Sequence, residues 1–260
     1  RNAAKQFSGE RAPKEWFAEH LFRRFTPEAA EEATKIYLQL GEEGDRSQLI
    51  AVANRLRQHL RSKEAFELLQ SRLDDFEKDG DFLDLLASLG NQQKKFDQAW
   101  AWTRQSLRLT DSPDKLDSRL AVAVALANQK EKLGEALQKE AELTVPEKIL
   151  VAELLYRGGK QKEALEKLAA LQSAGHQLDL VLYQTMRIHR REQNWNEATE
   201  ILERLVEQSK HNRSEYVSLL VRVYQQRGDF RKALTWAKRW RELSPNLSTV
   251  WLKEAELQLK

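Results

Sequence analysis

The chain of 260 residues contains no cysteine, which excludes disulfide bonds, thiolate metal sites and a cysteine nucleophile. It has only 5 prolines and 10 glycines, so a long irregular linker is not expected. No run of about 18 apolar residues occurs, and we therefore expect no membrane-spanning helix. Lys and Arg number 43 against 40 Asp and Glu, and this near balance favours neither nucleic acid nor a membrane surface as the partner.

Patterns typical of enzymes are also missing. The five histidines lack the spacing of metal ligands, and the pair Gly158 and Gly159 lacks the Lys-Ser/Thr sequence of a phosphate-binding loop. We interpret that glycine pair as a turn between helices. We expect His189 to pack in the core with a satisfied ring nitrogen. The sequence thus predicts a protein that is not an enzyme, with no metal and no cofactor.

An alanine recurs along the chain at a nearly constant interval. The intervals are 36, 34, 37, 28, 34 and 35 residues, and their mean is 34. Each alanine lies early in an amphipathic segment that follows another amphipathic segment of similar length. A fixed period of this size predicts stacked two-helix units, none of which buries its apolar face alone. The alanines are Ala29, Ala65, Ala99, Ala136, Ala164, Ala198 and Ala233.

The clearest unit lies between about residues 214 and 247. Its first segment places apolar residues from Val217 to Tyr224 at helical spacing, and its second segment ends before Ser244-Pro245. Gly228 marks the turn between them, because glycine adopts left-handed backbone conformations at little cost. At the other end of the chain, Thr26-Pro27-Glu28 predicts a helix start.

The residues Tyr224, Gly228, Phe230, Ala233, Ala237 and Pro245 resemble the tetratricopeptide repeat (TPR) motif position by position. The resemblance implies an all-α fold, a right-handed superhelical α-solenoid of helix-turn-helix repeats. We expect one solenoid over residues 1–260, with about seven repeats and an unpaired C-terminal helix. The weakest repeat is expected near residues 117–144, where a truncated second helix would follow the segment Leu116–Asn128 and the alanine interval shortens.

In TPR proteins the first helix of each repeat lines a concave groove that binds a partner. The matching positions here form two halves. The N-terminal half is rich in amides: Asn54, Arg57, Gln58, Asp84, Ser88, Asn91, Gln92, Asn128 and Gln129. The C-terminal half is basic, with Glu153 and the predicted partner-binding residues Tyr156, Arg157, Tyr183, Arg187, Arg190, Arg191, Arg222, Gln225 and Gln226. Arginine forks and amides can bind a peptide backbone or carboxylates, and we expect charge reversal of Arg187 and Arg191 to abolish partner binding without loss of helicity.

The chain also resembles the periplasmic TPR region of bacterial exopolysaccharide-export outer-membrane proteins of the Pel type. The stretch from Trp16 to Gly44 and the segment Ala99-Trp100-Ala101-Trp102 carry this resemblance. It implies a non-catalytic scaffold in the periplasm, within a biofilm polymer export machine, that recruits a polysaccharide-modifying enzyme. Polysaccharide is a further expected partner, whereas nucleic acid and membrane contact by this segment are not expected. The alternative is a cytoplasmic TPR adaptor that binds a peptide ligand on its groove.

Overall fold

The computed structural model describes residues 11–129, 134–135, 137, 142–175, 177–208 and 213–259, and these contain fifteen helices and no strand. The predicted all-α class is confirmed. Within the described ranges, every helix is too short or too polar to cross a bilayer. The helices are α2 (Arg11–Phe22), α3 (Pro27–Glu42), α4 (Arg46–Gln58), α5 (Ser62–Ser71), α6 (Leu73–Phe76), α7 (Gly80–Gln92), α8 (Phe96–Arg108), α9 (Pro113–Gln129), α11 (Val145–Arg157), α12 (Gln161–Ala174), α13 (Leu178–Arg191), α14 (Trp195–Gln208), α15 (Arg213–Arg227), α16 (Phe230–Leu243) and α17 (Ser248–Gln258).

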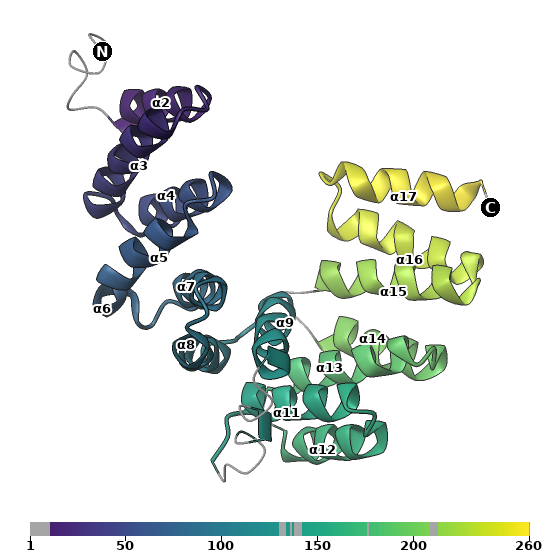
Figure 1. The fold of residues 1–260 in the computed structure, drawn as a ribbon. Helices are drawn as coiled ribbons and strands as arrows, with labels where there is room; N and C mark the ends of the chain where they lie inside the picture. The colour runs from purple at the N-terminus through teal and green to yellow at the C-terminus, as the bar shows by residue number, and fades with distance from the viewer. Residues whose placement is uncertain are drawn as a thin grey trace. The chain divides into compact units, whose positions relative to one another are not determined.

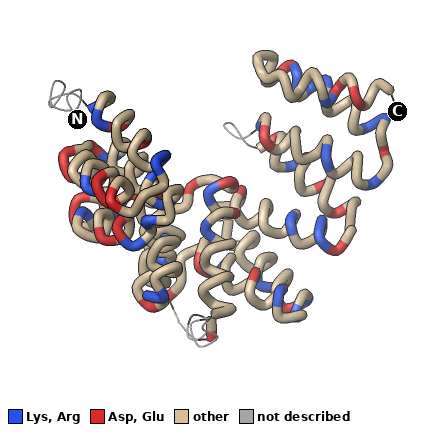
Figure 2. The backbone as a smooth tube through the Cα atoms, turned by 45° about the horizontal axis from the view of Figure 1, so that its top comes forward, with Lys and Arg blue, Asp and Glu red and all other residues tan. Residues whose placement is uncertain are grey.

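Contacts divide the chain into two compact units. The first unit contains Arg1–Thr110 and Arg119–Ala136, and the second contains Asp111–Ser118 and Leu137–Lys260. The boundary therefore falls within α9 and the segment after it, which is where the alanine interval shortens. Lys and Arg are interspersed with Asp and Glu along the helices of each unit (Figure 2).

Consecutive helices pack as antiparallel pairs in both units (Figure 1). The first unit contains the pairs α2–α3, α4–α5 and α7–α8, and the second contains α11–α12, α13–α14 and α15–α16. Neighbouring pairs are joined by further packing, for example between α3 and α4 and between α14 and α15. These pairs are the two-helix units that the alanine period predicts.

The recurring alanines lie where the two helices of each pair meet. All six that the structure describes are buried, with exposed fractions of 7% for Ala29 and 0% for Ala65, Ala99, Ala164, Ala198 and Ala233. A methyl group at this position allows two helices to approach closely, and any larger side chain would push them apart. Ala136 and the expected truncated second helix after α9 lie outside the described residues.

The turn inside each of the six pairs contains one residue with positive φ. In five pairs this residue precedes the alanine by five positions, and in the first pair by four. The predicted glycine turns at Gly159 and Gly228 are confirmed, but glycine occupies only these two of the six positions. The residues and their φ angles are Phe25 (54°), Leu60 (61°), Lys94 (59°), Gly159 (79°), Gln193 (59°) and Gly228 (84°).

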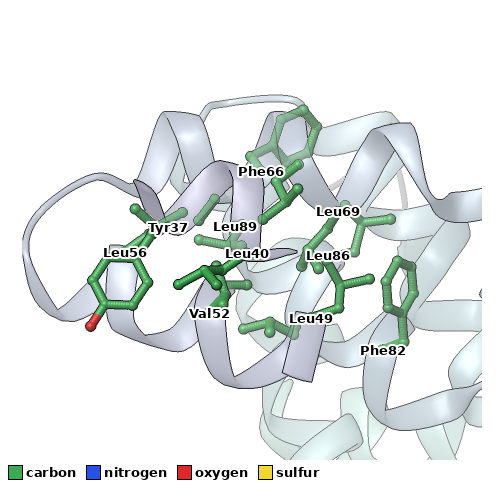
Figure 3. Packing of buried hydrophobic residues seen from close by; sticks show 14 of the residues in the cluster. Tyr37, Leu40, Leu49, Val52, Leu56, Phe66, Leu69, Phe82, Leu86 and Leu89 are labelled. Carbon is green, nitrogen blue, oxygen red and sulfur yellow. The ribbon is translucent and has the colours of Figure 1, made fainter. Parts of the chain in front are cut away.

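The core of the first unit fills the space between successive pairs. Tyr37 and Leu40 from α3 meet Leu49, Val52 and Leu56 from α4, and the same cluster continues into α5 and α7 (Figure 3). The predicted helix start at Thr26 is confirmed, because its side chain accepts a hydrogen bond from the backbone N–H of Ala29 at 3.3 Å. This cap fixes the point at which the chain turns from α2 into α3.

The core of the second unit is built in the same way. Met186 from α13, Leu202 from α14 and Leu220 from α15 belong to one buried cluster that extends to Ala237 on α16. The helix α16 ends at Leu243, before Ser244-Pro245, as predicted. The helix α17 packs on α16 and lies where the sequence predicts an unpaired C-terminal helix.

Candidate functional site

The nine predicted partner-binding residues all lie on first helices of pairs in the second unit. Tyr156 and Arg157 lie on α11, four residues from Tyr183 to Arg191 on α13, and three from Arg222 to Gln226 on α15. The helices α11 and α13 are in contact. We refer to these nine residues together as the first-helix face.

A buried carboxylate, Glu153, organises the α11 end of this face. Its side chain is 1% exposed and accepts hydrogen bonds from Arg157 Nε at 2.7 Å, Arg191 Nη1 at 2.8 Å and Gln184 Nε2 at 2.6 Å. Burial acts to raise the pKa of Glu153, but the hydrogen bonds from Arg157 and Arg191 outweigh it, and the pKa lies below its ordinary value. Glu153 is therefore a charged anchor between α11 and α13.

A second group of contacts joins α13 to the first turns of α9. Arg187 Nη1 lies 2.6 Å from Asp117 Oδ1, and the hydroxyl of Tyr183 donates to Asp117 Oδ2 at 3.0 Å. Burial raises the pKa of Tyr183, and the Asp117 carboxylate adds to this effect. Burial also lowers the pKa of the Arg187 guanidinium, against the attraction of Asp117. Arg187 and Tyr183 thus hold the helices of this unit together.

The remaining residues of the face make few internal contacts. Arg190 and Arg222 make no ion pair with any described residue, and Arg222 is exposed. Gln225 and Gln226 follow Arg222 on α15, and Gln226 is exposed. Tyr156 is half-buried and donates a hydrogen bond to Glu192 at 2.6 Å. The free groups are therefore two arginines and two amides.

Acidic groups lie near Arg222. Burial raises the pKa of Glu215 on α15, and the nearby charges of Asp114 and Asp117 raise it further, while Arg222 acts in the opposite direction. Acidic side chains therefore lie close to the basic first-helix face. A partner with both acidic and basic or amide groups fits it better than a purely anionic polymer.

The structure gives Arg187 and Arg191 a stabilising role that the sequence does not predict. Charge reversal of Arg187 or Arg191 would place a carboxylate against Asp117 or Glu153, so a loss of stability would accompany any loss of binding. The sequence indicates these arginines as exposed ligands because their helical positions match a groove. Asp117 was missed, because no local pattern connects it with a tyrosine 66 residues later.

Some residues of the amide-rich half, in the first unit, also make internal hydrogen bonds. Asp84 accepts hydrogen bonds from Ser106 and, at 3.0 Å, from Nε of Arg119, whose side chain is 1% exposed. Asn54 donates to the backbone oxygen of Ile50 at 3.0 Å. Arg119 is a buried ion-pair residue that the sequence does not reveal, because its apolar neighbours on α9 suggest a purely apolar core.

The sequence predicts that His189 packs in the core with a satisfied ring nitrogen, and the structure agrees with this only in part. The residue is partly buried at the end of α13, but its Nδ1 is buried and has no hydrogen-bond partner among the described residues. The prediction of a satisfied nitrogen is wrong for this atom. Burial lowers the pKa of His189, and Glu197 opposes this only in part.

Comparisons with known proteins identify no family for this chain. No protein-family model matches the chain, and no curated protein matches it. The similar solved structures include a tetratricopeptide repeat protein from Parabacteroides merdae, 15% identical, which covers 95% of this chain and 99% of that one with a TM-score of 0.47. Another is the P58(IPK) TPR domain, 13% identical, covering 95% of this chain and 78% of that one with a TM-score of 0.32.

A third similar structure is the assembly chaperone of RpL4 (Acl4), 14% identical, covering 83% of this chain and 96% of that one with a TM-score of 0.33. All three TM-scores lie below 0.5. The TPR-like character of this chain is therefore carried by its own helix pairs, their alanine period and their left-handed turns.

Proposed function

We propose that this chain is a non-catalytic scaffold that binds a protein partner on the first-helix face of its second unit. The observation that supports the proposal most directly is that Arg190 makes no ion pair with any described residue, although Arg187 and Arg191 on the same helix are both held in internal ion pairs. Arg222 on α15 is exposed and likewise makes no ion pair within the described ranges. The Glu153 and Asp117 networks fix α11, α13 and the start of α9 relative to one another, so the helix that carries Arg190 is positioned before a partner binds, which lowers the entropy lost on binding.

The finer proposal is that the chain belongs to a Pel-type exopolysaccharide export machine in the periplasm and recruits a polysaccharide-modifying enzyme. It rests on the sequence resemblance of residues 16–44 and 99–102. The alternative is a cytoplasmic adaptor for a peptide ligand. Cell fractionation of the epitope-tagged natural gene product distinguishes them, because recovery with the cytoplasmic markers would contradict the export proposal.

The binding proposal is tested in two steps. A photo-cross-linking amino acid at the exposed position of Gln226, introduced into the natural protein in its own cells, captures the partner for mass spectrometry. The affinity of that partner for the purified chain is then measured with the double variant Arg190→Glu and Arg222→Glu. We expect binding to weaken by about tenfold or more, because reversed charges at an interface are strongly unfavourable.

The matched control is Arg231→Glu with Lys238→Glu on α16, which changes the net charge equally on exposed residues of a second helix. This pair should leave the affinity nearly unchanged. Equal weakening by both pairs would show a general charge effect, and no weakening by the first pair would exclude the first-helix face. A partner identified as polysaccharide alone would contradict the scaffold proposal.

A further inference from the structure

The first unit contains a groove on a different set of elements from the first-helix face. Its volume is about 490 Å³, and it lies where the α2–α3 turn meets the α4–α5 turn. We call it the turn groove. Its lining includes Phe22, Phe25, Pro27, His59, Leu60 and Arg61.

Two large apolar side chains of the turn groove are almost fully exposed. Phe25 is 93% exposed and Leu60 is 91% exposed. Both occupy the left-handed position that occurs once in each helix pair, and the other four pairs have Lys94, Gly159, Gln193 and Gly228 there. Large apolar residues at this position are thus confined to two neighbouring turns that border one groove.

Neither local conformation nor core packing accounts for these two residues. A bulky side chain at positive φ is sterically unfavourable, and glycine or a polar residue would suit the turn better. Exposed side chains also contribute little to the stability of the unit. Adjacent exposed apolar groups of this kind mark interaction sites on protein surfaces, and backbone strain often occurs at such sites.

Two stacked aromatic rings belong to the lining of the turn groove. The rings of Phe22 and His59 are stacked, with centroids 3.9 Å apart and planes within 9° of parallel. Phe22 is itself packed in the core, and His59 Nε2 lies 3.4 Å from Glu19. Ring faces fixed in this way can receive a large apolar or aromatic side chain from outside.

The rim of the turn groove is basic. The two turns, residues 23–26 and 59–61, contain three arginines and no Asp or Glu. Arg61 lines the groove and pairs with Glu64 at 3.5 Å, whereas Arg23 and Arg24, which are exposed and directly precede Phe25, make no ion pair with the described part of the chain. Unpaired arginines beside an apolar groove are complementary to carboxylates that flank an apolar side chain.

We propose that the turn groove binds a short segment of a protein partner in which a large apolar or aromatic side chain is flanked by Asp or Glu. The apolar side chain enters the groove between Phe25 and Leu60 and lies on the Phe22 and His59 rings. The flanking carboxylates meet the arginines of the rim. This site is independent of the first-helix face, and either can exist without the other.

The test begins with a phage library of random dodecapeptides selected on the purified full chain. Enriched peptides are then synthesised with a fluorescent label, and their affinities are measured by fluorescence polarisation for the chain and its variants. The decisive variant combines Phe25→Gly with Leu60→Gly. It removes both apolar side chains but suits the left-handed backbone, so it should fold at least as well as the natural chain.

The matched control combines Lys94→Gly with Gln193→Gly, which makes the same backbone change at two turns outside the groove. We expect selected peptides to combine a large apolar residue with Asp or Glu. Their affinity should fall by about tenfold or more in the Phe25 and Leu60 variant, remain unchanged in the control, and weaken as salt increases.

Three results would overturn the proposal. One is the absence of peptides that combine apolar and acidic residues, and another is equal binding to the natural chain and the decisive variant. The third concerns a lipid surface, which is tested with vesicles of phosphatidylcholine and anionic phosphatidylglycerol. Vesicle binding that depends on Phe25 and Leu60, without peptide binding, would assign these residues to membrane contact instead.

Discussion

Nη1 of Arg191 lies 2.8 Å from Oε1 of Glu153, a carboxylate 38 residues earlier in the chain. The contact joins the first helices of two successive pairs in the second unit, and Arg157 and Gln184 complete the set of donors to the same carboxylate. A charge this deeply buried is tolerated because three donors replace its hydration. The arginines of this region therefore stabilise the fold before they can serve any partner.

Substitution of Glu153 by Gln should destabilise the second unit by about 2 kcal/mol. Two arginines would lose their buried, negatively charged partner, and the polar atoms of the new amide would match their N–H donors poorly. Urea unfolding followed by circular dichroism measures the change. The control is Glu166→Gln on α12, where the Lys162–Glu166 pair is 3.9 Å long and both side chains are exposed. This control should change stability by less than about 0.5 kcal/mol. Similar effects of the two substitutions would show that the Glu153 network contributes nothing beyond a surface pair.

Substitution of Lys94 or Gln193 by Gly should stabilise the chain by up to about 1 kcal/mol each, because their left-handed backbone is strained for any residue with a Cβ atom. The reverse change, Gly228→Ala, should destabilise by a similar amount. No heavy atom lies within 4 Å of a Cβ built at Gly228, so this change isolates the backbone effect. Chemical denaturation measures all three, and destabilisation by the glycine substitutions would contradict the explanation.

Substitution of Gly80 by Ala should destabilise the first unit by about 2 kcal/mol, because the new methyl group would overlap the buried guanidinium of Arg119. The measurement is the free energy of unfolding in a double-mutant cycle with Arg119→Met. We expect a smaller penalty for Gly80→Ala in the Arg119→Met background, since the overlapping group is gone. Equal penalties in both backgrounds would place the strain elsewhere. Gly158→Ala, whose new methyl group meets no atom closer than 3.4 Å, is a near-neutral control.

Substitution of His189 by Phe should reduce the acid sensitivity of the second unit. The pKa of His189 is lowered from its ordinary value of 6.5, so the unfolded chain binds the proton first. The stabilising contribution is present above that value and is lost as the pH falls through it toward the folded-state pKa. Free energies of unfolding measured between about pH 7 and about pH 5 should therefore decline less in the variant. Parallel declines in the two proteins would rule out this role of His189.

The first-helix face and the turn groove were predictable from sequence to different degrees. The helical positions of Arg190 and Arg222 follow from the repeat register, which is local information. The internal ion pair of Arg187 does not follow from the repeat register, because its partner Asp117 belongs to a different helix far earlier in the chain. The turn groove was not predicted either, because Phe25 and Leu60 look like ordinary apolar residues until their backbone conformation and exposure are known.

The sequence by itself determined the two-helix units of this protein. Helix starts such as Thr26, turns such as Gly228 and the buried alanines depend on neighbours within one repeat, and these interactions are fixed by residue order. Only the tertiary structure decided which polar groups remain without an internal partner. An arginine on a helix surface forms an ion pair within the protein when another helix places a carboxylate beside it, and otherwise it stays unpaired. The tertiary structure also decided that two exposed turns, 35 residues apart at Phe25 and Leu60, border one groove.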